Sequence, residues 1–463
     1  MEVVNSNFII PLGAREATNA QWVGPKAANL AVLAQAGLPT PGGFCLVADA
    51  YRWQVRHSGL EAAARGTFGT ENDSQARRYA LQMKLGLMEQ PVAPEVLEPL
   101  LAAWRSLREQ SGAPCVVRSS ALVEDRFGSS FAGQFESFLG LEDETEFLTA
   151  VRACWTALWS TRALRYMATH DLDPADTAMA LLMQPLVQAR CAGGALSQTV
   201  EGDLLINATW GLGAAIAQGE VTPDRYVLSR DGALKEAQVG VKQRHDPSCA
   251  HSARARIGSS QVAPTPCLDP KQIAELGRLV RETEKLMNMP VEIEWALDEA
   301  GFKLLQSRPL HLQDAPVPDE SWRRYPRLNG QPAGVGWGTG RACVVNCECE
   351  LSRVAPGDVL VTRMAGPALG QILPRVAGVV AELGGSTSHL ASLARERGIP
   401  MVLGVQDATH RIPEGSNVAV DGVAGVVRWM KSDRAVVEFH EKNEALTSNH
   451  DSRITTHGFK TPI

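Results

Sequence analysis

The chain has 463 residues, of which 44% are apolar and 21% charged, and its net charge is −6. This length predicts two or three domains, and the composition is that of an ordinary soluble globular protein. The acidic balance gives no electrostatic reason to expect nucleic acid or an anionic membrane as a partner. No apolar run is long enough to span a bilayer, and the first ten residues lack a secretion signal, so we expect a cytoplasmic protein.

The nine cysteines are scattered along the chain, which predicts reduced thiols rather than a disulfide framework. Cys343, Cys347 and Cys349 come closest to a cluster. Val344 and Val345, which follow the first of them, are typical of a strand, and this pattern argues against a metal site there.

Residues 1–312 alternate short apolar strands with amphipathic helices, which predicts an α/β or α+β domain, here of two lobes that divide near residue 190. A helix is expected to end at Gly37, and residues 240–270 have the composition of a surface loop. Residues 313–332, rich in proline and charge, predict a linker, and residues 333–430 a smaller domain. Residues 431–463 form a tail that we expect to be poorly ordered.

The first candidate site residue along the chain is Lys26, which follows Gly24 and Pro25 at the start of a helix. A lysine at this position can reach a phosphate that also contacts backbone N–H groups. From the residues alone, an exposed lysine at a helix start explains the pattern as well.

A second motif runs from Val116 through Arg118 to a loop of small residues that contains Gly133. A strand that ends in an arginine and two serines, followed by such a loop, is suited to holding a polyphosphate, because arginine offers paired donors and glycine an accessible backbone. An arginine paired with Glu124 or Asp125 in a polar loop is the alternative.

The third motif predicts a β-hairpin, with Glu292 and Glu294 on one face of its first strand and Gln306 and Arg308 on one face of the second. The oxygens of Glu294 and Gln306 suit Mg²⁺, and Arg308 can neutralise charge on a phosphate during its transfer. A ladder of paired Glu and Arg side chains on a solvated sheet remains the alternative.

The most informative stretch lies at residues 382–404, where two glycines and three hydroxyl residues precede His389 at the start of a predicted helix. The free N–H groups at a helix start favour anions. This arrangement predicts a histidine that carries a phosphoryl group; the alternative is a capped helix with an incidental surface histidine.

These motifs resemble those of the dikinases, the family that contains phosphoenolpyruvate synthase and pyruvate phosphate dikinase and is related to rifampin phosphotransferase and phenylphosphate synthase. The stretch at His389 is similar to the family pattern GGxTSHAAIxARExGIPAVxG, from which Leu390 and Ser392 depart. The second and third motifs resemble VRSSAxxEDxxxxSFAGQ and DIEWxxD…LQxRP, with Glu292 in place of the aspartate. Ala214 stands where relatives carry a glutamate.

The resemblance implies an ATP-grasp-like nucleotide-binding domain followed by a small swivelling β/β/α phosphohistidine domain. It implies ATP and Mg²⁺ as cofactors. The residues that it assigns to the nucleotide are Lys26, Arg118, Gly133, Gln184 and Arg308, and those that it assigns to the metal are Glu294 and Gln306. His389 would be the catalytic nucleophile, attacking the β-phosphorus of ATP with release of AMP.

The acceptor of the phosphoryl group stays open. The α/β barrel of the larger relatives needs about 250 residues, and we expect none within this sequence. An unidentified small molecule, bound here or on a separate subunit, is the main expectation. A condensing enzyme that activates a small molecule, or a phosphocarrier that serves a partner protein, are the alternatives.

Overall fold

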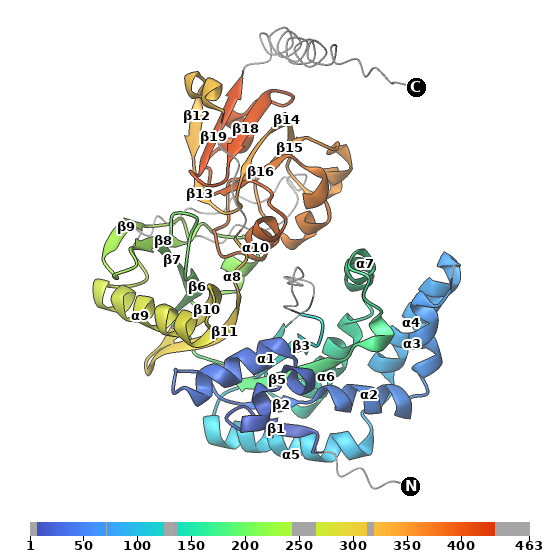
Figure 1. The fold of residues 1–463 in the computed structure, drawn as a ribbon. Helices are drawn as coiled ribbons and strands as arrows, with labels where there is room; N and C mark the ends of the chain where they lie inside the picture. The colour runs from blue at the N-terminus through green and yellow to red at the C-terminus, as the bar shows by residue number, and fades with distance from the viewer. Residues whose placement is uncertain are drawn as a thin grey trace, which may run out of the picture. The chain divides into compact units, whose positions relative to one another are not determined.

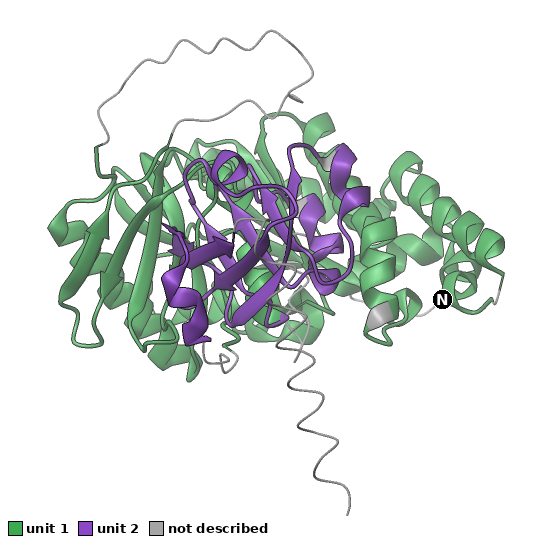
Figure 2. Ribbon diagram, turned by 90° about the horizontal axis from the view of Figure 1, so that it is seen from above, with its two compact units in different colours: residues 1–246, 257–313, 384–396 green, residues 247–256, 314–383, 397–463 purple. Residues whose placement is uncertain are grey.

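The computed structural model describes residues 7–70, 72–124, 135, 137–242, 265–312 and 319–430. Its contacts group the chain into two compact units, coloured separately in Figure 2. Unit 1 comprises residues 1–246, 257–313 and 384–396, and unit 2 comprises residues 247–256, 314–383 and 397–463. Gly133, the tail at 431–463 and most of the polar stretch after residue 240 lie outside the described residues, and the predicted domain limits stay predictions.

The first sheet of unit 1 is antiparallel, with strand order β1-β2-β5-β3-β4. The apolar run of β5 is buried along almost its whole length, as the central strand of a covered sheet requires. Its strands are β1 (Ile9–Pro11), β2 (Phe44–Leu46), β3 (Cys115–Ala121), β4 (Ser137–Leu141) and β5 (Met179–Pro185).

Helices α1, α5 and α6 pack against this sheet (Figure 1). Trp155 and Trp159 are fully buried beneath them. The helices of this lobe are α1 (Ala20–Gln35), α2 (Ala48–His57), α3 (Glu61–Phe68), α4 (Asp73–Glu89), α5 (Pro94–Ser111), α6 (Glu144–Ala157) and α7 (Thr161–Thr169), with the short η1 (Arg15–Thr18) and η2 (Pro174–Asp176). Across the described ranges, no helix combines the length and the apolar character that a membrane crossing requires.

Helix α1 ends where the sequence predicts, with Gly37 in the left-handed region at φ 80°. The helix is broken near its start by Gly24, whose φ of 74° and ψ of 157° are not helical. A Cβ atom at Gly24 would lie 2.2 Å from the carbonyl oxygen of Ser120. Pro25 then opens the second helical section, where its missing N–H costs nothing, and the Ser120 hydroxyl accepts from the backbone N–H of Ala27 at 3.2 Å. Ser120 of strand β3 therefore fixes where the second helical section begins, and with it the position of Lys26.

The second sheet of unit 1 is also antiparallel, with strand order β11-β10-β6-β7-β8-β9. Helix α9 packs against β10, and a capping box of Asp269 and Gln272 closes the start of this helix. The elements of this lobe are β6 (Cys191–Leu196), β7 (Leu204–Trp210), α8 (Ala214–Ala217), β8 (Asp224–Leu228), β9 (Leu234–Gln238), α9 (Pro270–Met287), β10 (Val291–Asp298) and β11 (Gly301–Pro309).

Unit 2 is built on an eight-stranded sheet with strand order β12-β19-β18-β14-β15-β16-β17-β13, in which β14 to β17 run parallel. Two of its strands, β12 and β13, form inside the range expected to be linker. The strands are β12 (Arg327–Asn329), β13 (Gln331–Pro332), β14 (Trp337–Val345), β15 (Val359–Thr362), β16 (Gly378–Ala381), β17 (Met401–Leu403), β18 (Asn417–Asp421) and β19 (Val426–Met430). The short helices of this unit are η3 (Glu320–Arg324), η4 (Glu348–Arg353), η5 (Pro367–Gln371), η6 (Leu373–Arg375) and α11 (Ala408–Arg411).

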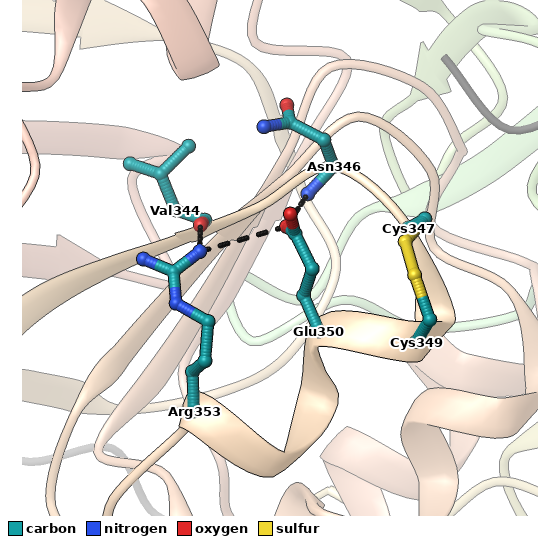
Figure 3. The surroundings of a disulfide bond; sticks show 6 residues. All are labelled: Val344, Asn346, Cys347, Cys349, Glu350 and Arg353. Atoms are coloured by element: carbon teal, nitrogen blue, oxygen red, sulfur yellow. Dashed lines mark hydrogen bonds and ion pairs between the residues drawn. A yellow bond between two sulfur atoms is a disulfide. The ribbon is translucent and has the colours of Figure 1, made fainter. Parts of the chain in front are cut away.

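Two cysteines of unit 2 correct the expectation of reduced thiols. Cys347 and Cys349 form a disulfide at the start of η4, with their Cα atoms 5.4 Å apart (Figure 3). The expectation came from the scatter of the nine cysteines along the chain, whereas Cys347 and Cys349 are separated by a single residue and are joined locally. Val344 and Val345 lie in β14 as predicted, and Cys343 is buried there as a free thiol.

Candidate functional site

The predicted hairpin is confirmed as β10 and β11, which pair in the expected register. Glu294 lies opposite Gln306, and Glu292 lies opposite Arg308. Because successive strand residues alternate between faces, these two pairs share one face of the sheet. The four polar side chains are therefore neighbours.

Arg118 connects this hairpin to the first sheet. Its Nη2 atom donates to Glu294 Oε2 and to Gln306 Oε1, at 2.8 Å each. Its Nη1 atom donates to the carbonyl oxygen of Leu305. Of the two alternative partners that the sequence left open, Glu124 binds Lys26 instead, and Asp125 lies outside the described residues. A single guanidinium thus brings the two predicted metal ligands onto one point.

Lys26 is buried, which excludes the exposed helix-start lysine that the sequence left open. Its Nζ atom donates to the Ser119 carbonyl oxygen at 2.8 Å and forms an ion pair with Glu124 at 3.2 Å. Glu124 also accepts from the backbone N–H of Ala121 at 2.9 Å. The lysine is consequently held against the end of β3, at Ser119, the residue that follows Arg118.

Gln184 is buried on β5, where its Nε2 atom donates to the Gly42 carbonyl oxygen at 3.0 Å. This bond holds the chain after Gly37 against the sheet. Gln184 lies opposite Val116 of β3, two residues before Arg118, so the side chains of Gln184 and Arg118 are on the same face of the first sheet.

His389 is the first residue of α10 (His389–Glu396), as the sequence predicts. The helix is capped by Ser388, whose hydroxyl accepts from the Ala391 backbone N–H at 3.2 Å. Although α10 lies between two strands of unit 2 in the chain, residues 384–396 belong to unit 1 by their contacts. His389 therefore lies with the residues of the hairpin.

Residues 384–396 pack on the second sheet through glycines. A Cβ atom at Gly194 of β6 would lie 2.6 Å from Cβ of Thr387, and one at Gly385 would lie 2.4 Å from Cγ of Pro223. The Gly384 backbone N–H also donates to the Val221 carbonyl oxygen at 3.1 Å. Any side chain at Gly194 or Gly385 would force the two surfaces apart.

A buried charged cluster lies beside this contact. Glu292 Oε2 accepts from the Ser392 hydroxyl at 2.6 Å and from Arg395 Nη2 at 3.0 Å, and it forms an ion pair with Arg308 at 3.2 Å. Arg308 Nη2 donates to Ser392 Oγ at 2.7 Å. The Glu–Arg pairing that the sequence left open is thus present, but it is buried rather than solvated.

Sequence reasoning missed Ser392 and Arg395 as members of the site. The sequence placed both residues in a predicted helix, and it marked Ser392 as a departure from the family pattern. Neither observation indicated a role in the site. Their pairing with Glu292 spans about a hundred positions in the sequence, and no local periodicity reports such a contact.

Burial of His389 favours its neutral form. Burial lowers the pKa of His389 below its ordinary 6.5, an effect opposed mainly by Glu294 and reinforced by Arg308. Burial raises the pKa of Glu294, but Arg118, His389, Arg308 and Lys26 together outweigh it and lower that pKa. Burial likewise opposes ionisation of Glu292, yet Arg308 and Arg395 lower its pKa to about 2. The site therefore combines a neutral imidazole with ionised carboxylates.

These electrostatic contacts define one candidate site from residues far apart in sequence. Around His389 the structure gathers Lys26, Arg118, Glu294, Gln306 and Arg308. Within the described ranges, no three or more His, Cys, Asp or Glu side chains form a metal-binding group. The site holds instead the side-chain oxygens of Glu294 and Gln306, three cationic side chains and the imidazole of His389.

Comparisons with known proteins agree with this geometry. Residues 20–326 match the family described as pyruvate phosphate dikinase, AMP/ATP-binding domain, and residues 354–425 match the PEP-utilising enzyme, mobile domain. Phosphoenolpyruvate synthase of Aeropyrum pernix is 31% identical over 459 residues, covering 88% of this chain and 56% of that protein. The probable phosphoenolpyruvate synthase of Methanothermobacter thermautotrophicus is 31% identical over 453 residues, covering 94% of this chain and 64% of that protein.

Phosphoenolpyruvate synthase of Escherichia coli is 28% identical over 460 residues, covering 93% of this chain and 58% of that protein. The chain thus spans little more than half the length of these relatives. The match to the AMP/ATP-binding domain alone covers well over half of the sequence, and the mobile-domain match follows it in the same order as the two predicted domains. The predicted fold class is thereby confirmed, and the chain belongs to the pyruvate phosphate dikinase AMP/ATP-binding family.

Proposed function

We propose that this chain is an ATP-dependent dikinase-type phosphotransferase that phosphorylates its own His389. The observation that supports this most directly is the position of His389 among Lys26, Arg308 and Glu294, with its imidazole kept neutral by burial. A neutral imidazole has a free lone pair, and cations nearby offset the negative charge of an approaching polyphosphate.

The cationic residues would divide the phosphates of ATP between them. Lys26 and Arg118 lie near the end of β3, and Arg308 lies beside α10. Gln184 would contact the nucleotide from β5, and the loop at Gly133 would supply backbone N–H groups. Most of the rate enhancement would come from holding the reactants in line and neutralising charge.

The proposed reaction has three steps. A ring nitrogen of His389 attacks the β-phosphorus, the bond to the α-phosphate oxygen breaks, and AMP leaves with that oxygen. Water then attacks the terminal phosphorus of the pyrophosphorylated histidine, which releases inorganic phosphate and leaves phosphohistidine. The phosphoryl group finally passes to an acceptor oxygen, and His389 returns to its neutral form.

Glu294 and Gln306 fit a site for Mg²⁺. Their oxygens converge within hydrogen-bond distance of one atom, Arg118 Nη2, and one or two protein oxygens are what Mg²⁺ usually takes beside nucleotide phosphates. When bound, the ion would supply charge neutralisation on those phosphates. Arg118 would have to turn from these oxygens towards the phosphates, and its long side chain permits this.

The acceptor is proposed to be a small molecule. Because the relatives are phosphoenolpyruvate synthases, pyruvate is the first compound to test. A separate acceptor-binding subunit is an alternative within this proposal. The proposed location of the reaction is the cytoplasm, where ATP is abundant.

The test is to mix the purified chain with Mg·ATP alone and to compare wild type with His389→Ala. We expect a phosphoryl adduct on the wild type only, detected by intact mass, and AMP rather than ADP among the nucleotides. Stoichiometric release of AMP by His389→Ala would refute the role of His389. ADP as the product would refute the dikinase reaction. AMP formed only when pyruvate or another small molecule is present would favour a condensing enzyme.

A further inference from the structure

Two residues that depart from the family pattern are in direct contact. Glu292 replaces the usual aspartate of the hairpin motif, and Ser392 replaces the usual isoleucine of the histidine motif. The Ser392 hydroxyl donates to Glu292 Oε2 at 2.6 Å. An isoleucine at position 392 could not make this bond, so each departure is complemented by the other.

The hydroxyl of Ser392 uses its full bonding capacity at this contact. It donates to Glu292, and it accepts from Arg308 Nη2 at 2.7 Å and from Arg395 Nη2 at 3.3 Å. Ser392 and its three partners are all buried. Removing the hydroxyl would take one hydrogen-bond partner from the buried carboxylate of Glu292 and from each of the two guanidinium groups, and the loss of such a partner is costly away from water.

The hydrogen bond between Ser392 and Glu292 holds α10 against β10, and it also fixes the position of α10 along the direction of that strand. Ser392 follows His389 by three residues, so the two lie on one face of the helix about 4.5 Å apart along its axis. Glu292 and Glu294 lie on one face of β10, about 6.6 Å apart along the strand. Holding Ser392 at Glu292 therefore fixes the place of His389 relative to Glu294.

We propose that Ser392 and Glu292 form a latch that positions His389 for phosphorylation. In this role Ser392 is a positioning residue, because it acts through the helix and does not touch the reacting atoms. The proposal rests on the proposed function for its consequence in catalysis, but not for its effect on the packing of residues 384–396.

The test compares full-length wild type with Ser392→Ala, Ser392→Thr and Ser106→Ala. Ser106 is an exposed serine of α5, so its replacement controls for a serine-to-alanine change within a helix. The first measurement, made without nucleotide, is hydrogen exchange of the peptide that contains Gly384, whose N–H donates to Val221 on the other surface. The second is the single-turnover rate of phosphohistidine formation, together with the affinity for ATP.

We expect Ser392→Ala to speed exchange at Gly384 about tenfold and to slow phosphohistidine formation by a similar factor, since a hydrogen bond to a charged group is lost. The affinity for ATP should not change. Ser392→Thr, which keeps the hydroxyl, should restore most of both effects, and Ser106→Ala should match wild type.

The two measurements separate the latch from the proposed function. Wild-type exchange at Gly384 in Ser392→Ala would overturn the latch, whatever the assay with ATP shows. An equal effect of Ser392→Thr would also overturn it, because the hydroxyl would then be irrelevant. Faster exchange in Ser392→Ala, in a protein that forms no phosphohistidine even as wild type, would support the latch and refute the proposed function.

Discussion

Replacing Gly194 by alanine should separate the histidine segment from the second sheet without touching any charged group of the site. Gly194 lies in β6, and the Cβ atom of an alanine there would lie 2.6 Å from Cβ, 2.7 Å from Oγ1 and 3.0 Å from Cγ2 of Thr387. No positive φ is involved at Gly194, so the substitution strains no backbone. The overlap can be relieved only by movement of Thr387 and, with it, of His389 two residues later.

The magnitude follows from the cost of inserting one methyl group into a packed contact, which is about 1 to 3 kcal/mol. If only the packed arrangement can be phosphorylated, this cost lowers its population and slows phosphohistidine formation about 5- to 150-fold, since 1.36 kcal/mol corresponds to a factor of ten. The affinity for ATP and the melting temperature of unit 1 should change little, because the obstacle lies on the surface that receives residues 384–396.

The assay is rapid quench after mixing with Mg·ATP, followed by quantification of AMP and of phosphorylated protein. Gly13→Ala is the matched control, because a Cβ atom there would meet nothing within 4 Å. A wild-type rate for Gly194→Ala would refute the reasoning, since it would mean that phosphorylation does not need residues 384–396 in this position. A tenfold loss of affinity for ATP would refute it differently, by placing the damage in the nucleotide pocket.

Three further predictions follow from the site and from unit 2. Because burial lowers the pKa of His389, its imidazole stays neutral below pH 6.5. The rate of phosphohistidine formation should therefore reach half its maximum below that pH. A midpoint at or above pH 6.5 would contradict the burial of His389. Arg118→Ala removes hydrogen bonds to Glu294 and to the hairpin backbone, and should lower the free energy of unfolding by about 2 kcal/mol in a urea titration, whereas an unchanged midpoint would show that the bridge contributes nothing. The intact mass before and after reduction should differ by the two hydrogens of one disulfide. Alkylation should label Cys347 and Cys349 only after reduction. Labelling of both without a reductant would show that the bond is absent.

The parts of the structure that the sequence predicts well are those set by local pattern. The alternation of residues 291–298 and 301–309 predicted a hairpin with Glu292 and Glu294 on one face and Gln306 and Arg308 on one face of the partner strand, and the structure pairs them across the two strands. The end of α1 at Gly37 and the start of α10 at His389 followed from the known preferences of helix termini.

What could not be predicted depends on partners distant in sequence. Lys26 looked like a helix-start lysine, and only the fold shows that Glu124 and the Ser119 carbonyl oxygen hold it in the interior. For Arg118 the sequence left pairing with Glu124 or Asp125 open as the alternative, whereas β11 offers it two acceptors from the other sheet. The order of the strands, which decides both contacts, leaves no local trace in the sequence, because pairing between distant segments does not depend on the residues between them.

Gly24 and Gly194 differ in whether a mutation at each can be suppressed by a change elsewhere. At Gly194 the obstacle to a larger residue is the side chain of Thr387, whose Cβ is the nearest atom, so Thr387→Gly can remove it. At Gly24 the obstacle is the backbone of Ser120, and the φ of 74° disfavours any L-residue independently. A search for second-site suppressors should therefore succeed for Gly194→Ala and return only true revertants for Gly24→Ala. At the broken start of α1, two constraints therefore act against any substitution of Gly24, and no single second mutation relieves both.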